Sequence, residues 1–181
     1  MITREELERA RERAREYFRK ACIVLTAEEA DSIEVADFGL SELDRTGLEI
    51  VTYVNTERCC AKELILFPRQ TCPEHMHPPL DGAPGKEETF RCRWGEVYLY
   101  VPGEPTRNPA CQPPPAPKGS YTVFHEIILR PGEQSTLPPH TLHWFQAGPD
   151  GAVVSEFSTT SRDDLDIFSD RRIARMPVVS D

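Results

Sequence analysis

The chain has 181 residues, of which 39% are hydrophobic and 28% are charged, as in globular proteins that bury a sizeable core. Its net charge of -9 argues against nucleic acid as a partner, because nucleic-acid binding needs clustered Lys and Arg. No stretch approaches the roughly 20 apolar residues of a membrane span, so we expect no membrane partner either. A small, neutral or weakly charged molecule is the ligand class that fits best.

An export signal begins with a basic segment that is followed by an apolar run. The start of this sequence is instead charged and has no apolar run, so we expect no export signal. The sequence contains six cysteines, and without an export signal these are expected to be reduced thiols. No CxxC pair occurs, which argues against a thiolate zinc site. The expected location is therefore the cytoplasm.

The N-terminal segment predicts helices. Residues 3–21 predict an amphipathic helix, because apolar side chains recur there at three- and four-residue spacing. These side chains are Leu7, Ala10, Ala14, Phe18 and Ala21. Thr26 and Glu29 form a capping box, which predicts the start of a second short helix. We expect both helices to pack on the outside of the main fold, with a contact between two copies of the chain as the alternative.

From Gly47 onward the sequence predicts strands, which are short, rich in β-branched and aromatic residues, and separated by Pro or Gly turns. The expected strands are residues 48–55, 62–67, 92–101, 121–129 and 152–158. Many short strands without intervening helices indicate an antiparallel sandwich or barrel. We therefore expect one mainly β domain, with a helical segment (1–46), a β-barrel (47–160) and a C-terminal tail (161–181).

Residues 102–120 contain seven prolines and no periodic apolar pattern. Proline lacks the amide hydrogen that a central strand needs, so this segment is expected to be a loop. Two functions stay open for it. It is either a surface connection, or a lid or partner contact, since long loops in compact domains are often functional.

The most informative residues are His75 and His77, which stand two apart. Residues two apart in a strand point to the same face, so both imidazoles are expected to enter one cavity. Glu88 follows eleven residues after His77, and His143 comes much later, after two prolines. An HxH pair alone also occurs by chance on protein surfaces. The combination of imidazoles with a carboxylate suits Mn, Fe, Co, Ni or Zn.

This combination resembles the two sequence motifs of the cupin superfamily. The first motif is HxH, then Glu, then Gly, and it is matched by the histidine pair, Glu88 and Gly95. The second motif, PxGxxH, is matched from Pro138 to His143, with His140 where the family has glycine.

The resemblance implies a metal site in a small β-barrel. One divalent ion would be bound by His75, His77, Glu88 and His143. His140 is the alternative to His143, although the family position favours His143. His125 lies between the two motifs, and we expect it to be structural.

A longer resemblance narrows the family. It is carried by the runs YVNTERCCAKELILFPRQTCPEHMHPP, GKEETFRCRWGEVYLYV, LPPHTLHWFQAG and GAVVSEFSTTSRDDLDIF. These runs resemble the bacterial D-lyxose isomerases of the cupin class, from about residue 21 to residue 172. The resemblance implies an antiparallel jelly-roll barrel and a metal-dependent interconversion of D-lyxose and D-xylulose, with D-mannose and D-fructose as a second pair. It also implies a homodimer and favours Mn²⁺, with Co²⁺, Fe²⁺, Ni²⁺ and Zn²⁺ as alternatives.

An aldose–ketose isomerase moves one proton between C1 and C2 and another between O1 and O2, through a metal-stabilised enediolate. The resembling enzymes use a Lys and a Glu near the metal, and Lys62 and Glu156 match these positions. We assign Glu156 to proton transfer at carbon, and Lys62 to charge stabilisation or proton transfer at O1 and O2. The alternatives are an outward-facing Glu156, a solvated Lys62, and Glu88 acting as the base.

Three further side chains are candidates for binding the sugar. Lys86 precedes Glu88 by two residues and shares its direction if that segment is extended. Asp166 lies in a charged segment whose alternative is a solvated tail. Trp144, with Phe145 beside it, can stack on the apolar face of a sugar or belong to the core.

Three other functions compete with this one. A metal-dependent cupin dioxygenase uses the same ligand types but needs no Lys and Glu for proton transfer. A non-catalytic sugar-binding cupin would tolerate loss of the ligands, so the intact set counts against it. A cupin isomerase for another sugar, such as mannose or ribulose, shares nearly all of the expected chemistry.

Overall fold

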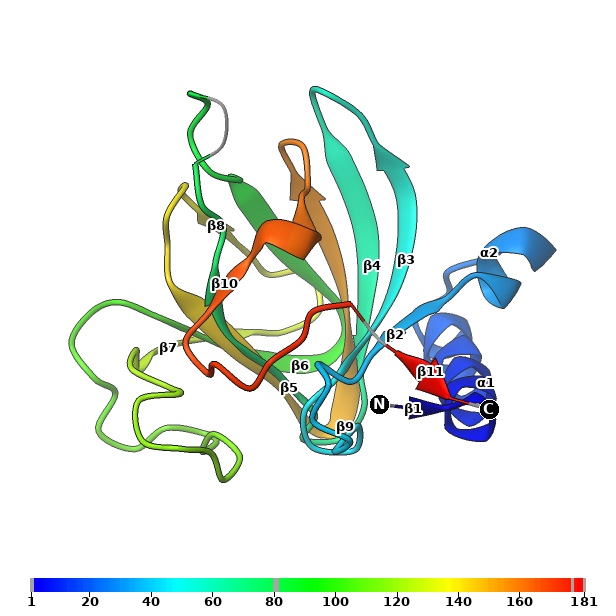
Figure 1. The fold of residues 1–181 in the computed structure, drawn as a ribbon, viewed down its shortest axis with the longest axis horizontal. Helices are drawn as coiled ribbons and strands as arrows, with labels where there is room; N and C mark the ends of the chain where they lie inside the picture. Colours follow the sequence, from blue (N-terminus) through cyan, green and yellow to red (C-terminus); the bar gives the residue numbers. More distant parts are fainter. Residues whose placement is uncertain (1, 80–81, 177, 181) are drawn as a thin grey trace.

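The computed structural model describes residues 2–79, 82–176 and 178–180. Helix α1 (Arg4–Lys20) begins after a capping box formed by Thr3 and Glu6, and helix α2 (Ala27–Asp31) begins after the predicted box. The apolar side of α1 packs against outward-facing side chains of the sheet, including Ile65 and Val153. Helix α1 therefore lies on the outside of the sheet, beside β2 and β3, as predicted (Figure 1). No helix in the described residues is long and apolar enough to cross a membrane.

The strands of the described residues form two sheets. A short parallel pair joins β1 (Ile2–Thr3) to β11 (Val179–Ser180). All other strands form one nine-stranded antiparallel sheet. They are β2 (Glu34–Ala36), β3 (Leu48–Asn55), β4 (Cys60–Leu66), β5 (Thr71–Met76), β6 (Glu88–Val101), β7 (His125–Leu129), β8 (Gln134–Leu137), β9 (His143–Ser158) and β10 (Ile167–Phe168).

The large sheet curls into a barrel-like shape, and the long strands β6 and β9 form part of its wall (Figure 1). Strand β9 pairs with β4, β5 and β6, and the pairing with β6 is interrupted by two irregularities. Such bulges bend a strand and increase its twist. One irregularity adjoins Gly95, whose φ is 72° and where an added Cβ would lie 2.1 Å from the carbonyl oxygen of Gly151. Only glycine fits this close approach. The curled antiparallel sheet is the barrel that the sequence predicts.

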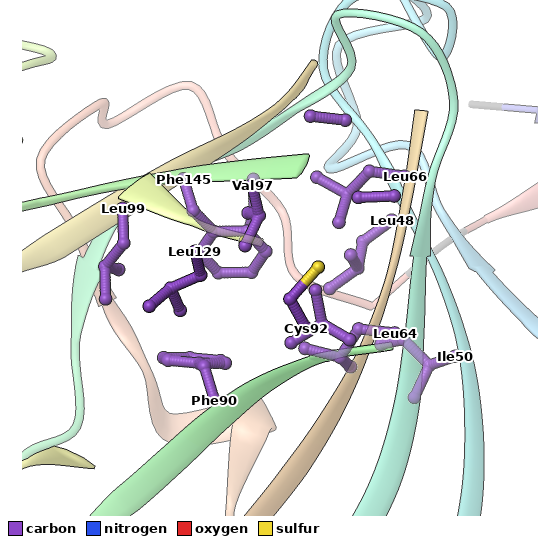
Figure 2. Close-up of a cluster of buried hydrophobic side chains, with 14 of the residues drawn as sticks. Leu48, Ile50, Leu64, Leu66, Phe90, Cys92, Val97, Leu99, Leu129 and Phe145 are labelled. Atoms are coloured by element: carbon purple, nitrogen blue, oxygen red, sulfur yellow. The ribbon is translucent and has the colours of Figure 1, made fainter. Parts of the chain in front are cut away.

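The concave side of the sheet is apolar over much of its depth (Figure 2). Leu64 and Leu66 of β4 belong to this core, whereas Ile65 between them packs under α1 on the outside. By the same alternation, Lys62 shares the inward face of β4 with the two leucines. A charged residue at one end of an otherwise apolar interior is the first sign of a functional site.

The structure contains strands in the N-terminal and C-terminal segments, where the sequence predicts none. Strand β2 lies within the segment expected to be helical, and it pairs with β3. Strand β10 lies within the segment expected to be a tail, and it pairs with β5. The charged segment before β10 is therefore not a solvated tail. Strands of two or three residues are too short to show a periodic pattern, which is why the sequence does not reveal them.

Residues 102–120 form an irregular loop, as predicted. Its residue Cys111 packs with Tyr98, Tyr100, Val123 and Trp144 in a separate cluster. None of its residues, all of which the structure describes, lines the cavities at the candidate site. The predicted strand at 121–129 begins only at residue 125. The amide groups of Thr122 and Val123 donate to the buried carboxylate of Glu74 instead of to a neighbouring strand.

Candidate metal centre

Three histidines meet at one end of the curled sheet. His75 on β5 lies opposite His143 at the start of β9, and His77 directly follows β5. One ring nitrogen of each lies within 4.8 Å of the others, and all three side chains are buried. The sequence spacing that predicted a shared direction for His75 and His77 thus brings them to the same point, together with His143.

Each of these histidines has a partner for its Nδ1 atom. Nδ1 lies 2.8 Å from Pro73 O in His75, and 2.9 Å from Thr141 O in His143. In His77 it lies 2.5 Å from Asp166 Oδ1. These acceptors favour the tautomer with the proton on Nδ1, which leaves Nε2 free as a metal ligand.

The centre also contains an unsatisfied polar atom. Nε2 of His143 is fully buried and makes no hydrogen bond with the described residues, although Glu88 Oε1 lies 3.1 Å away. Buried polar atoms without partners are rare, and they are explained where a ligand or ion completes the site. Burial lowers the pKa of His75 and of His143, so both rings are neutral, as metal ligation requires. Burial also lowers the pKa of His77, but Glu88 and Asp166 outweigh it and raise the pKa to about 9, so this ring would release a proton on binding a metal ion.

Glu88, the first residue of β6, brings a carboxylate to the cluster. Its Oε1 lies 3.1 Å from Nε2 of His77 and 3.1 Å from Nε2 of His143. Burial by itself raises the pKa of this carboxyl, but Lys86 and the two histidines outweigh burial and hold the pKa well below its usual value. The four residues together present three nitrogens and an ionised carboxylate, a donor set that fits Mn²⁺, Fe²⁺, Co²⁺, Ni²⁺ or Zn²⁺.

The other two histidines lie outside the cluster. His140 is exposed in the turn before β9, so it is not an alternative to His143. Its φ of 64° lies in the left-handed region that favours glycine, which explains why the cupin motif has glycine at this position. His125 is exposed, and its Nδ1 lies 3.1 Å from Glu104 O.

Lys62 and Glu156 face each other across β4 and β9 and are both buried. Lys62 Nζ lies 4.0 Å from Glu156 Oε1. Lys86 is closer, with its Nζ 2.7 Å from Glu156 Oε1 and 2.9 Å from Glu88 Oε2. Burial disfavours the charged form of Lys86, but Glu156 and Glu88 outweigh burial and hold its pKa well above its usual value. One ammonium group therefore joins Glu88 to Glu156.

The C-terminal segment supplies residues that the sequence did not single out. Asp163 Oδ2 lies 2.6 Å from Lys62 Nζ and 3.1 Å from Arg175 Nη2. Arg175 also pairs with Glu34 on β2. Lys62 and Asp163 are 101 positions apart, and a charged run gives no local signal of such a distant partner. Asp166, expected at the sugar, contacts His77.

Two cavities lie at this end of the sheet. One of about 970 Å³ is open to the surface, and its walls include His77, Lys86 and Asp166. A smaller cavity is lined by His75 of the histidine cluster and by the facing pair Lys62 and Glu156. The open cavity is large enough to admit a sugar, and it reaches the histidine cluster at His77.

Trp144 does not belong to this site. Its side chain is fully buried in the separate cluster, stacked on Tyr100 with ring centroids 3.9 Å apart, and its Nε1 donates to Val123 O. Phe145, the next residue, instead lines the smaller cavity. Because His143 faces the barrel interior, strand alternation places Phe145 on the same face and Trp144 on the opposite one.

The curled antiparallel sheet and the buried histidine cluster at its mouth define a cupin-fold protein whose centre can hold a metal ion. Solved structures agree on the fold. The L-ribose isomerase of Acinetobacter sp. DL28, in complex with L-ribose, superposes with a TM-score of 0.77 at 19% identity, covering 99% of this chain and 98% of that one. The L-ribose isomerase of Cellulomonas parahominis gives a TM-score of 0.74 at 19% identity, covering 95% and 94%. No protein-family model matches the chain.

Relatives of known name are much more similar in sequence. The D-lyxose ketol-isomerase of Cohnella laeviribosi is 62% identical over 174 residues, which are 96% of each chain. The D-lyxose/D-mannose isomerase of Thermosediminibacter oceani is 59% identical over 181 residues, which are 100% of each chain. The chain belongs to the D-lyxose ketol-isomerase family, and it is a sugar ketol-isomerase, an intramolecular oxidoreductase.

Proposed function

We propose that the chain interconverts D-lyxose and D-xylulose, with D-mannose and D-fructose as a second pair, at one divalent metal ion. The proposed ligands are His75, His77, Glu88 and His143. The observation that carries the proposal is the buried set of three imidazoles with a carboxylate, beside which an ammonium group is ion-paired to a second carboxylate. The sugars follow from the relatives, one named for D-lyxose and one for D-lyxose and D-mannose.

Catalysis requires stabilisation of negative charge at O1 and O2 and a base at carbon. A divalent ion at this centre would polarise these oxygens and stabilise the charge that develops on them. Glu156 is the proposed base, which removes the proton from one carbon and returns it to the other. Lys62 is proposed to stabilise charge or move the proton at O1 and O2. Lys86, beside Glu156, is proposed to contact a sugar oxygen.

The same chemistry accounts for activity on two sugars. D-lyxose and D-mannose have the same configuration at C2, so both present nearly the same atoms to the centre. Their difference lies at the far end of the sugar, where the open cavity provides room. An isomerase acting on another sugar remains the alternative that the assay addresses. Dioxygenase chemistry has no support from the relatives, which are named as isomerases.

Three finer assignments accompany the proposal. Mn²⁺ is the proposed ion, since the donor set admits it and the resembling isomerases favour it. A homodimer is proposed from the same resemblance, and gel filtration with light scattering tests it. A cytoplasmic location is proposed because all six cysteines are free thiols, as expected in a reducing compartment.

The test is conversion of D-lyxose to D-xylulose by chelator-stripped protein under anaerobic conditions, with and without Mn²⁺. Activity that returns with Mn²⁺ in the absence of oxygen supports a metal-dependent isomerase. The same assay with D-mannose and with D-ribulose measures the sugar preference. If metal binds and neither D-lyxose nor D-mannose reacts, the proposed substrates are wrong.

A further inference from the structure

Asp166 differs from the other partners of the histidine cluster. His75 and His143 direct Nδ1 to backbone carbonyl groups, whereas His77 directs Nδ1 to a carboxylate. The side chain of Asp166 is only 6% exposed. Burying a carboxylate is costly unless a partner compensates, so its contact with His77 is a specific feature of the site.

The fold holds Asp166 in this position. Asp166 follows the short 3-10 helix η1 (Asp163–Leu165) and directly precedes β10. Strand β10 pairs with β5, so that Phe168 lies opposite His75, with their ring centroids 5.4 Å apart. The strand that carries His75 therefore also fixes the segment that carries Asp166.

The charges of the site point to the same residue. Lys62 pairs with Asp163, and Lys86 pairs with Glu156. Arg175 pairs with Glu34. Three cations thus face five carboxylates, because Glu88 shares Lys86 with Glu156 and Asp166 forms an ion pair with none of the three. Glu88 and Asp166 both contact the histidine cluster, and the excess of two negative charges is one that a divalent ion would neutralise.

We propose that Asp166 is a positioning residue for the metal, and this inference rests on the proposed function. Its carboxylate accepts a hydrogen bond from the Nδ1–H group of His77, fixes the ring with Nε2 toward the other ligands, and adds negative charge to the centre. A carboxylate in this role makes the imidazole a better ligand, and its loss typically lowers metal affinity about 10- to 100-fold.

The first test measures Co²⁺ affinity of the chelator-stripped full chain by its visible absorption, in competition with a chelator. D166N is compared with D164N, which makes the same change at an exposed residue two positions away. We expect about 10- to 100-fold weaker binding for D166N, and affinity within about two-fold of wild type for D164N. Equal affinities of the two variants would overturn the inference alone. Failure of wild type to bind Co²⁺ would contradict the proposed function as well.

A second measurement separates positioning of His77 from general disorder of the segment. Ring N–H signals of ¹⁵N-histidine are recorded on the Zn²⁺-loaded protein, for wild type and D166N. We expect D166N to move the Nδ1–H signal of His77 and to leave those of His75 and His143 in place. If all three signals change together, Asp166 only stabilises the segment and the positioning role is wrong.

Discussion

Lys86 Nζ lies 2.7 Å from Glu156 Oε1 and 2.9 Å from Glu88 Oε2, so one buried ammonium group connects the proposed base to a proposed metal ligand. The arrangement places the two carboxylates on either side of one cation. Glu88 contacts the histidines, and the ammonium group of Lys86 lies between Glu88 and Glu156. Substitution of each carboxylate should therefore give a different phenotype.

Glu156→Gln is expected to keep the fold and the metal while losing rate. A lost general base typically reduces kcat by about 10²- to 10⁴-fold, because proton transfer at carbon then lacks an acceptor. The measurements are kcat with D-lyxose and Co²⁺ affinity. Glu16→Gln on the exposed side of α1 is the control and should match wild type. If Glu156→Gln retains full activity, Glu88 becomes the candidate base.

His143→Ala is expected to lose metal binding and activity together, since it removes a ligand nitrogen from the centre. His140→Ala is the matched control, because His140 is the exposed histidine three positions earlier. Co²⁺ titration and D-lyxose turnover are measured for both variants, with circular dichroism to confirm folding. Retention of metal by folded His143→Ala would show that the ligand assignment is wrong.

Glu49 makes stability depend on pH. Burial raises the pKa of this carboxyl from about 4.5 to about 8, while its Oε1 accepts a hydrogen bond from Gln70. The folded state then holds a proton that the unfolded chain releases, so stability falls as pH rises from about 4.5 to about 8. Each unit of difference in pKa corresponds to about 1.4 kcal/mol.

Glu49→Gln stays neutral at every pH and should remove this decline. Urea unfolding at pH 5.5, 7 and 8.5 measures it, and the gain of the variant over wild type should grow with pH. Glu12→Gln on the exposed side of α1 is the control. A gain that does not change with pH would mean that Glu49 is ionised in the folded protein at all three values.

Glu74 anchors the end of the proline-rich loop. Its buried carboxylate accepts hydrogen bonds from the amide groups of Thr122 and Val123 and from the hydroxyl group of Ser169. Glu74→Ala leaves these groups without their acceptor, at about 1–3 kcal/mol for each buried group. We expect a loss of roughly 3 kcal/mol or more in the free energy of unfolding, measured with urea.

The loop itself should also loosen in Glu74→Ala, so limited proteolysis within 102–120 should become faster. Glu104→Ala, in the exposed part of the same loop, is the control for both measurements. Equal stability of the two variants would show that Glu74 does not hold the loop.

The sequence predicts α1 and β3 well, whereas it finds only residues 92–101 of β6 and only residues 152–158 of β9. The strand at 48–55 has the predicted bounds, and α1 differs from its prediction by one residue at each end. The short β2 and β10 contain too few residues to show any alternation. The position of β10 also depends on pairing with β5, which lies far earlier in the chain, and a local pattern does not encode such a pairing.

The site residues, too, are predicted only where a local pattern of the sequence identifies them. His75 and His77 are found by local spacing, and the period-2 rule applied to His143 would also have favoured Phe145 over Trp144 as a cavity residue. Asp163 and Arg175 could not be found, because their roles depend on contacts with Lys62 and Glu34 far away in the chain.

The pairing of β10 with β5 has a consequence for truncation of the chain. All four proposed metal ligands lie before residue 144, and the proposed base and β9 are complete by residue 158. A chain cut before residue 161 would therefore keep the proposed ligands and the proposed base but lose Asp163, Asp166 and Arg175. It would also lose Phe168 and Ile173, which pack against the apolar interior, so the C-terminal segment completes both the core and the charged wall of the site.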